Sequence, residues 1–225
     1  LTFCVFQILP GNPAHIILGV DADPLQVEAL SKEMGLDLPL QQRYVNWVVG
    51  LFSGDLGNSL RYQTPVAQLI ADSLPVTVSL TALALLITVV LVVPLSVYLA
   101  KNNNRALPTA ISALLQLGVA VPSFWLSILL VLIFAVTLRW LPSGDFVPFT
   151  TNVTGALRSL LLPAVAISVG TTAVVIRYLK NTLLDQMGMD YVRTARSKGL
   201  AKNEVLYRHV LKNALLPTVT ILGMI

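Results

Sequence analysis

The chain has 225 residues, of which 55% are hydrophobic and only 12% are Asp, Glu, Lys or Arg, with a formal net charge of +4. Soluble domains carry roughly a quarter of their residues as these four types, and a globular chain cannot cover its surface with about half that share. Together with a mean hydropathy of +0.76, the composition excludes a disordered chain, argues against a soluble enzyme and indicates an integral membrane protein.

Both ends of the sequence are apolar. Residues 1–9, LTFCVFQIL, have no basic residue before them and no cleavage site typical of a secretory signal, so they are expected to be the end of a transmembrane helix. Ala214–Ile225 is apolar but too short to span, which favours a fragment that also stops inside a helix. Cys4 is the single cysteine, and the two histidines, His15 and His209, lie far apart. No disulfide, metal site or cofactor is therefore expected.

Residues 10–73 are predicted to be an extracytoplasmic segment with short helices. Pro24–Leu36 is predicted as one helix, because Asp23 can cap it and Gly35 suits its end. Leu40–Phe52 has the apolar spacing of a second helix, with aromatic side chains suited to a membrane interface. The segment either caps the ends of membrane helices, which is the simpler interpretation, or docks an external partner.

The same segment continues with SGDLGNS, which is predicted to be a turn. A further short helix is predicted to begin over Val66–Ile70. Residues 74–225 are then expected to form the membrane core.

Three long runs without a charged residue lie in this core, at residues 73–100, 106–138 and 159–176. They contain 28, 33 and 18 residues, and about 20 apolar residues in a helix span a bilayer. A buried helix of a large soluble protein is a weaker interpretation, because three such runs would need an improbable core. The 33-residue run is too long for one untilted helix, so its ends extend into the interfaces or it is bent, and Pro122 favours a kink.

The distribution of charge predicts the orientation. Lys101 and Arg105 form a short basic link, and residues 177–212 carry eight basic residues against three acidic ones, so both should face the cytoplasm. Residues 10–72 carry seven acidic residues against three basic ones and should lie outside, with the link at residues 139–158. The positive net charge is thus a topology signal, and no nucleic-acid partner is expected.

Residues 189–217 are basic, amphipathic and broken once. Asp190 can cap a short helix, Lys198 suits its C-terminus, and Gly199 can take the left-handed conformation that ends it. A second helix, about Asn203–Asn213, would then lead into the membrane. This projection is either moved by a partner or is a charged anchor, and the residues alone favour neither.

The stretch DYVRTARSKGL…RHVLKNALLP resembles the cytoplasmic loop of permease subunits in ATP-binding-cassette importers of the peptide/nickel group. Gly199 takes the place of the loop glycine and Ala195 that of the second alanine, while Arg193 and Thr194 stand where the broader pattern has Glu and Ala. The stretches LPGNPA, GLDLPLQQRYVNWV, SGDLGNSL, LPVTVSLT, VPSFWLSILL and RWLP resemble the first permease subunit of that group in the same order.

The resemblance implies an all-α polytopic bundle of the type I importer permease (MetI-like) fold, truncated at both ends. It would hold the end of the first of six helices, the next three, and the start of the fifth. The implied setting is a bacterial inner membrane, and the implied function is a path for short peptides or nickel chelates. The implied partners are a second permease subunit, two cytoplasmic ATP-binding subunits, an external substrate-binding protein and the lipid bilayer.

The ATPase-coupling loop is expected at about residues 180–213, with these candidate residues: Asp190, Tyr191, Arg193, Thr194, Ala195, Arg196, Gly199, Leu200, Arg208 and His209. The sequence contains no GxxxxGK[ST] phosphate loop, GxSxG or HExxH motif, so no catalytic residue is expected and the energy should come from a partner. The candidates for the translocation path are Gln116, Pro122, Ser123, Ser127, Thr171 and Thr172. Serine and threonine in membrane helices more often bond to their own helix or a neighbour, so Gln116 is the favoured one.

Two other classes stay open at this point. An ion-coupled secondary transporter would need charges inside the spans, and a membrane enzyme would need paired acids or histidines there. The three apolar runs contain none of these.

Overall fold

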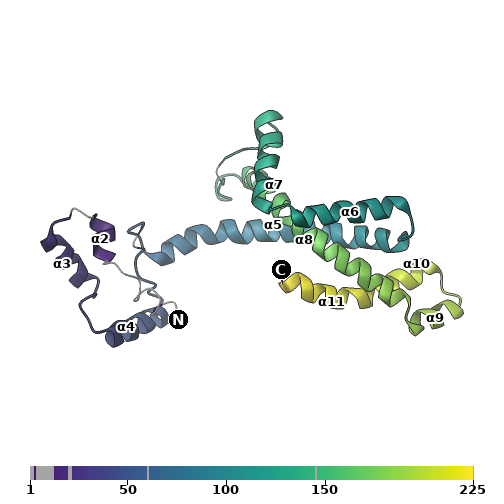
Figure 1. Ribbon diagram of the computed structural model, residues 1–225, viewed down its shortest axis with the longest axis horizontal. Helices are drawn as coiled ribbons and strands as arrows, with labels where there is room; N and C mark the ends of the chain where they lie inside the picture. Colours follow the sequence, from purple (N-terminus) through teal and green to yellow (C-terminus); the bar gives the residue numbers. More distant parts are fainter. Residues whose placement is uncertain (1–2, 4–12, 20–21, 60, 145, 225) are drawn as a thin grey trace. The chain divides into compact units, whose positions relative to one another are not determined.

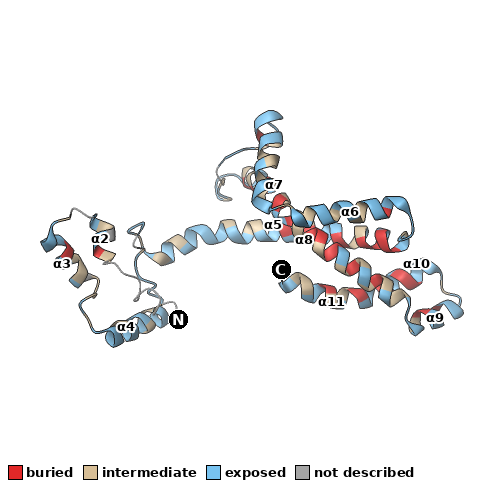
Figure 2. Cartoon of the chain, viewed as in Figure 1, coloured by how far each residue is buried: buried red, intermediate tan, exposed pale blue. Residues whose placement is uncertain are grey.

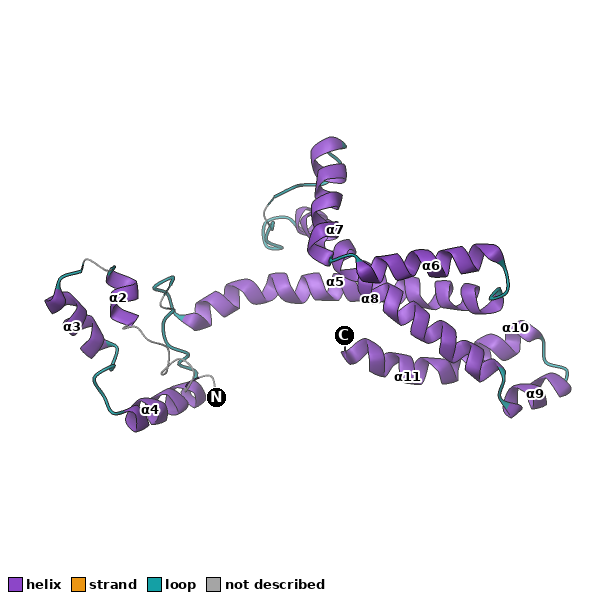
Figure 3. Cartoon of the chain, in the orientation of Figure 1, coloured by secondary structure: helices purple, strands orange, loops and turns teal. Residues whose placement is uncertain are grey.

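The computed structural model describes residues 3, 13–19, 22–59, 61–144 and 146–224. Every regular element among these residues is a helix, which confirms the predicted all-α fold (Figure 3). The chain forms two compact units, residues 1–75 and 76–225. Cys4 and most of the stretch predicted as the end of a membrane helix lie outside the described residues.

The first unit contains the short helices α2 (Pro13–Leu18), α3 (Pro24–Glu33) and α4 (Leu40–Ser53). The Asp23 carboxylate accepts the Leu25 amide at 3.0 Å, so the predicted cap of α3 is confirmed. The helix ends earlier than predicted, because Gly35 adopts φ +65 and the Leu36 amide donates back to the Ser31 carbonyl. A left-handed glycine of this kind satisfies the last carbonyls and prevents another turn.

Helix α4 carries an aromatic cluster. The ring of Phe3 lies 5.2 Å from that of Tyr44 and 5.7 Å from that of Trp47. The helix ends at Gly54 with φ +84, and the Asp55 carboxylate accepts the Gly57 amide at 2.9 Å. The predicted turn at SGDLGNS is therefore confirmed.

Helix α5 spans Val66–Lys101, so the prediction of a separate short helix at Val66–Ile70 is wrong. Residues 71–73 are Ala, Asp and Ser, none of which breaks a helix. Pro75 removes one backbone donor and does not end the helix. The result is one 36-residue helix, longer than the roughly 20 residues that a bilayer requires.

The second long run is broken in two. Helix α6 (Ala106–Ala120) and the helix formed by α7 (Ser123–Leu130) and the π-helical η1 (Val131–Thr137) meet at an angle of 102°. Val121 is extended because the ring of Pro122 disfavours a helical residue before it. The predicted bend at Pro122 is confirmed, and it is a full break.

Helix α8 (Val153–Met187) is the second continuous helix long and apolar enough to span a membrane. Asn152 begins it by accepting the Gly155 amide at 3.0 Å. It contacts α6, α7 and the C-terminal α11, and is therefore the central helix of the second unit (Figure 1).

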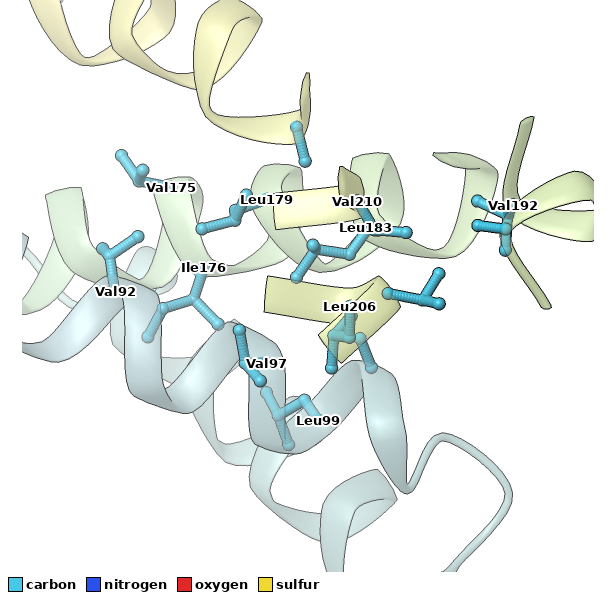
Figure 4. Close-up of a cluster of buried hydrophobic side chains, with 14 residues drawn as sticks. Val92, Val97, Leu99, Val175, Ile176, Leu179, Leu183, Val192, Leu206 and Val210 are labelled. Atoms are coloured by element: carbon cyan, nitrogen blue, oxygen red, sulfur yellow. The ribbon is translucent and has the colours of Figure 1, made fainter. Parts of the chain in front are cut away.

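The last elements are α9 (Asp190–Ser197), α10 (Lys202–Val205), the π-helical η2 (Leu206–Val210) and α11 (Leu211–Met224). The second helix predicted for the loop is thus present and extends further than expected. Buried residues of the second unit gather where α8 meets these elements and α5 (Figure 2). Figure 4 shows the centre of this cluster, where Leu179 and Leu183 of α8 converge with Leu99, Leu206 and Val210.

Candidate functional site

The short helix α9 is held on the bundle by one face. Val192 and Ala195, one turn apart, are buried in the cluster shared with α8 and η2. The Tyr191 hydroxyl donates to the Gln186 side chain of α8 at 2.8 Å, which fixes the start of the helix. The helix is therefore packed into the core and does not hang from it by a flexible linker.

The predicted cap of α9 is wrong. Met189 occupies the N-cap position without a side-chain hydrogen bond, and Asp190 is the first helical residue. The extended backbone of Met189 sets the start one residue earlier in the chain than expected. The Asp190 carboxylate still lies in the first turn, where the helix dipole favours negative charge.

The turn after α9 has the expected geometry. Lys198 is the C-cap and Gly199 adopts φ +83, with its amide donating to the Arg196 carbonyl at 2.9 Å. The Leu200 amide donates to the Ala195 carbonyl at 3.4 Å, and its side chain packs against the buried cluster. The glycine thus joins two anchored pieces at a fixed angle.

The opposite face of α9 is exposed and basic. Arg193, Thr194 and Arg196 point away from the core, and the Thr194 hydroxyl donates to the Asp190 carbonyl at 3.1 Å. Neither arginine belongs to an ion pair among the described residues. This face offers two guanidinium groups to a partner.

Residues that follow the Gly199 turn lie close to α9 and to the end of α5. Arg208 pairs with Glu204 at 3.3 Å on the surface, His209 is half-buried, and Lys101 of α5 lies 5.0 Å from the centre of the Tyr207 ring. A cavity of about 380 Å³ here is lined in part by Lys101, Arg196 and Lys202. The two basic segments predicted to be cytoplasmic therefore lie together.

A second, polar cleft lies between α6 and α8. Arg177 donates to the Gln116 side-chain oxygen at 3.4 Å, and Lys180 donates to the Ser112 hydroxyl at 3.4 Å. The cavity has a volume of about 290 Å³ and is also lined by Asn181. Gln116 thus has a polar partner, as expected for an amide in a membrane helix.

Sequence reasoning did not select Arg177 and Lys180, because it assigned them to the start of the cytoplasmic segment. The structure continues α8 to Met187, which keeps both cations on the helix. Their spacing of three residues places them on one helical face and was the available signal.

The other path candidates are not gathered in this cleft. Pro122 and Ser123 are exposed at the break between α6 and α7, and Ser127 is half-buried one turn further on. The Thr171 hydroxyl donates to its own helix at Ile167. The buried Thr172 hydroxyl donates to Thr88 of α5 at 3.1 Å and so links two helices.

Comparison with known proteins gives two family matches. Residues 92–225 match the family described as "Binding-protein-dependent transport system inner membrane component". Residues 1–81 match the N-terminal family of the same membrane component.

Individual relatives cover the whole chain. A protein of Brucella abortus named as a peptide transport system permease is 43% identical over 100% of the chain and 72% of the relative. The oligopeptide transport system permease protein of Bacillus subtilis is 32% identical over the same shares. An Escherichia coli protein named as a D,D-dipeptide transport system permease is 32% identical, again over 100% of the chain and 72% of the relative.

Proposed function

The chain belongs to the family of binding-protein-dependent transport system inner membrane components, and from this premise we propose that it carries short peptides into the cell. It is a multi-pass, non-enzymatic permease subunit of an ATP-binding-cassette importer in a bacterial inner membrane. Membership of this family implies ATP-binding and substrate-binding partners. Membership of this family also favours an ATP-driven importer over an ion-coupled secondary transporter.

Peptide is the proposed cargo in preference to nickel. The three relatives described above are named for peptide, oligopeptide or dipeptide transport. Among the described residues, no group of three or more His, Cys, Asp or Glu side chains offers a metal site.

The proposed complex contains a second permease subunit, two cytoplasmic ATP-binding subunits and an external binding protein. The exposed polar face of α6 and α8 supports the second permease subunit. Gln116, Arg177 and Asn181 are exposed on this face, and apart from the long Arg177–Gln116 bond lipid tails would offer their polar groups no hydrogen-bond partner. A protein neighbour or a water-filled passage satisfies them.

The proposed coupling element is α9 with its glycine turn. Its exposed arginines, Arg193 and Arg196, are suited to acidic or carbonyl groups of an ATP-binding subunit. The burial of Val192 and Ala195 supports a direct transfer of motion, because a push on α9 must move α8 and η2 with it. This burial is the observation that carries the mechanism.

Uptake by cells that lack the gene for this subunit tests the cargo. Labelled dipeptide and labelled nickel are supplied separately, with and without the gene restored on a plasmid. Peptide uptake should be lost in the deletion strain and return with the plasmid, while nickel uptake should not change. Normal peptide uptake without the subunit would overturn the proposal.

A further inference from the structure

Arg177 and Lys180 form a pair of cations with neutral partners. Each donates to one uncharged group, Gln116 or Ser112, and both distances are 3.4 Å, the long end of the hydrogen-bond range. Neither cation belongs to an ion pair in the part of the chain that the structure describes. Long bonds to neutral groups hold the cations in place and yield readily to a charged acceptor.

The position of the cleft along α6 and α8 limits which molecules can occupy it. Arg177 lies ten residues before Met187, the last residue of α8, and Gln116 lies ten residues after Ala106, the first residue of α6. Each is therefore about 15 Å along its helix from the end beside the basic link. The uncharged run of α8 ends at residue 176 and the helix continues to Met187, so Arg177 lies where the apolar span meets the predicted cytoplasmic segment, and its exposed guanidinium group needs protein, water or a passage beside it.

The lining of the cleft combines anion recognition with an apolar surface. The guanidinium group of Arg177 matches a carboxylate through two parallel hydrogen bonds, and Lys180 adds a point charge. Leu99, Leu115 and Ile176 line the same cavity. A volume of about 290 Å³ holds a carboxylate with the side chain next to it, and not a long peptide.

We infer that this cleft is a subsite of the translocation path that binds the C-terminal carboxylate of the peptide during its passage. The inference rests on the proposed peptide transport. Arg177 is the main contact, Lys180 a second charge, and Gln116 the group that positions Arg177. The apolar lining takes the last side chain without selecting its type.

The test uses the whole importer in proteoliposomes, with its ATP-binding subunits and binding protein. Transport of trialanine and of trialanine amide is measured at concentrations that load the binding protein equally. Arg177→Gln should lower the ratio of acid to amide transport about tenfold, the effect of losing one charged hydrogen bond. Arg177→Lys should restore most of the ratio, and Lys180→Gln should lower it less.

Arg158→Gln is the matched control. Arg158 is the arginine near the other end of α8 and donates to the Trp140 carbonyl at 2.7 Å, so its removal should leave the ratio unchanged. An unchanged ratio in Arg177→Gln, or an equal fall for both peptides, would overturn the inference and identify a contact with the second subunit. A ratio that follows the content of anionic lipid would overturn it in favour of a headgroup phosphate. Failure of the unaltered importer to carry either peptide would instead contradict the proposed function.

Discussion

Gly199 holds a backbone conformation that a side chain opposes. Its φ of +83 costs a non-glycine residue about 1–2 kcal/mol, although nothing lies within 4 Å of an added Cβ. Gly199→Val should therefore re-aim α9 and lower both ATPase stimulation and transport, while the amount of protein in the membrane stays the same. Gly199→Asn should be milder, because Asn tolerates this conformation. Uptake, ATPase rate and membrane level measured for each variant check the prediction.

Lys202→Ala is the control for this substitution, because Lys202 is exposed beyond the same turn. It should transport like the unaltered protein. If Gly199→Val also does so, the loop is an anchor and the proposed coupling role is wrong.

Local chemistry made some residues predictable from the sequence. Asp23 and Gly199 act within a few residues of their own position, so capping and turn rules identify them. The prediction that Asp190 caps α9 was wrong, because the N-cap position is set by the backbone angles of one residue, and here that residue is Met189. The contact between Gln116 and Arg177 joins residues 61 positions apart, and no local pattern encodes such a pair.

Helices α6 and α8 approach closely at a pair of glycines. A Cβ on Gly118 would lie 3.2 Å from a methyl group of Val169, and the Gly118 carbonyl lies 3.9 Å from the Cβ position of Gly170. Small residues at such crossings let backbones pack closely. Gly118→Leu should overpack the crossing and lower the free energy of unfolding by about 1–3 kcal/mol. Gly118→Ala should be nearly neutral, because the higher helix propensity of Ala offsets its close contact with Val169.

Thermal unfolding of the purified importer in detergent measures this effect. Gly223→Leu is the matched control, since Gly223 also lies in a helix and nothing lies within 4 Å of its Cβ position. Equal melting temperatures for Gly118→Leu and the unaltered protein would show that the crossing is loosely packed.

At the scale of elements, apolar runs and helix-breaking residues predicted which helices exist more accurately than the residues at which they begin and end. Pro122 marked the break between α6 and α7 because its ring restricts Val121. The same residue type at Pro75 lies inside α5, and the helix continues through it. The rule that a proline restricts the residue before it applies equally to both, yet Val121 is extended and Leu74 stays helical, so this rule alone does not distinguish the two prolines.

For the second unit as a whole, the buried cluster connects the proposed coupling element, α9 with its glycine turn, to the polar cleft. Val192 and Ala195 reach it from α9, and Ile176 and Leu179 reach it from α8 next to Arg177. A rigid displacement of α9 thus shifts the helix that carries the proposed carboxylate contact. If α9 is the coupling element as proposed, the densely packed cluster transmits its motion to the cleft directly, without an intervening segment.

The distribution of basic residues predicts the orientation of the whole molecule in the membrane. In a background with Cys4 replaced by Ala, single cysteines are introduced at Trp47, Lys101 or Lys202, all exposed positions. Cells are treated with a membrane-impermeant maleimide before and after permeabilisation. Position 47 should react in intact cells, because basic residues are sparse in its segment, and position 101 only after permeabilisation, because it lies in a basic link. Position 202 must behave like 101, since Lys101 and Lys202 line one cavity. Reaction of 101 and 202 from outside would reverse the orientation, and different behaviour of the two would contradict the packing of α5 against the loop.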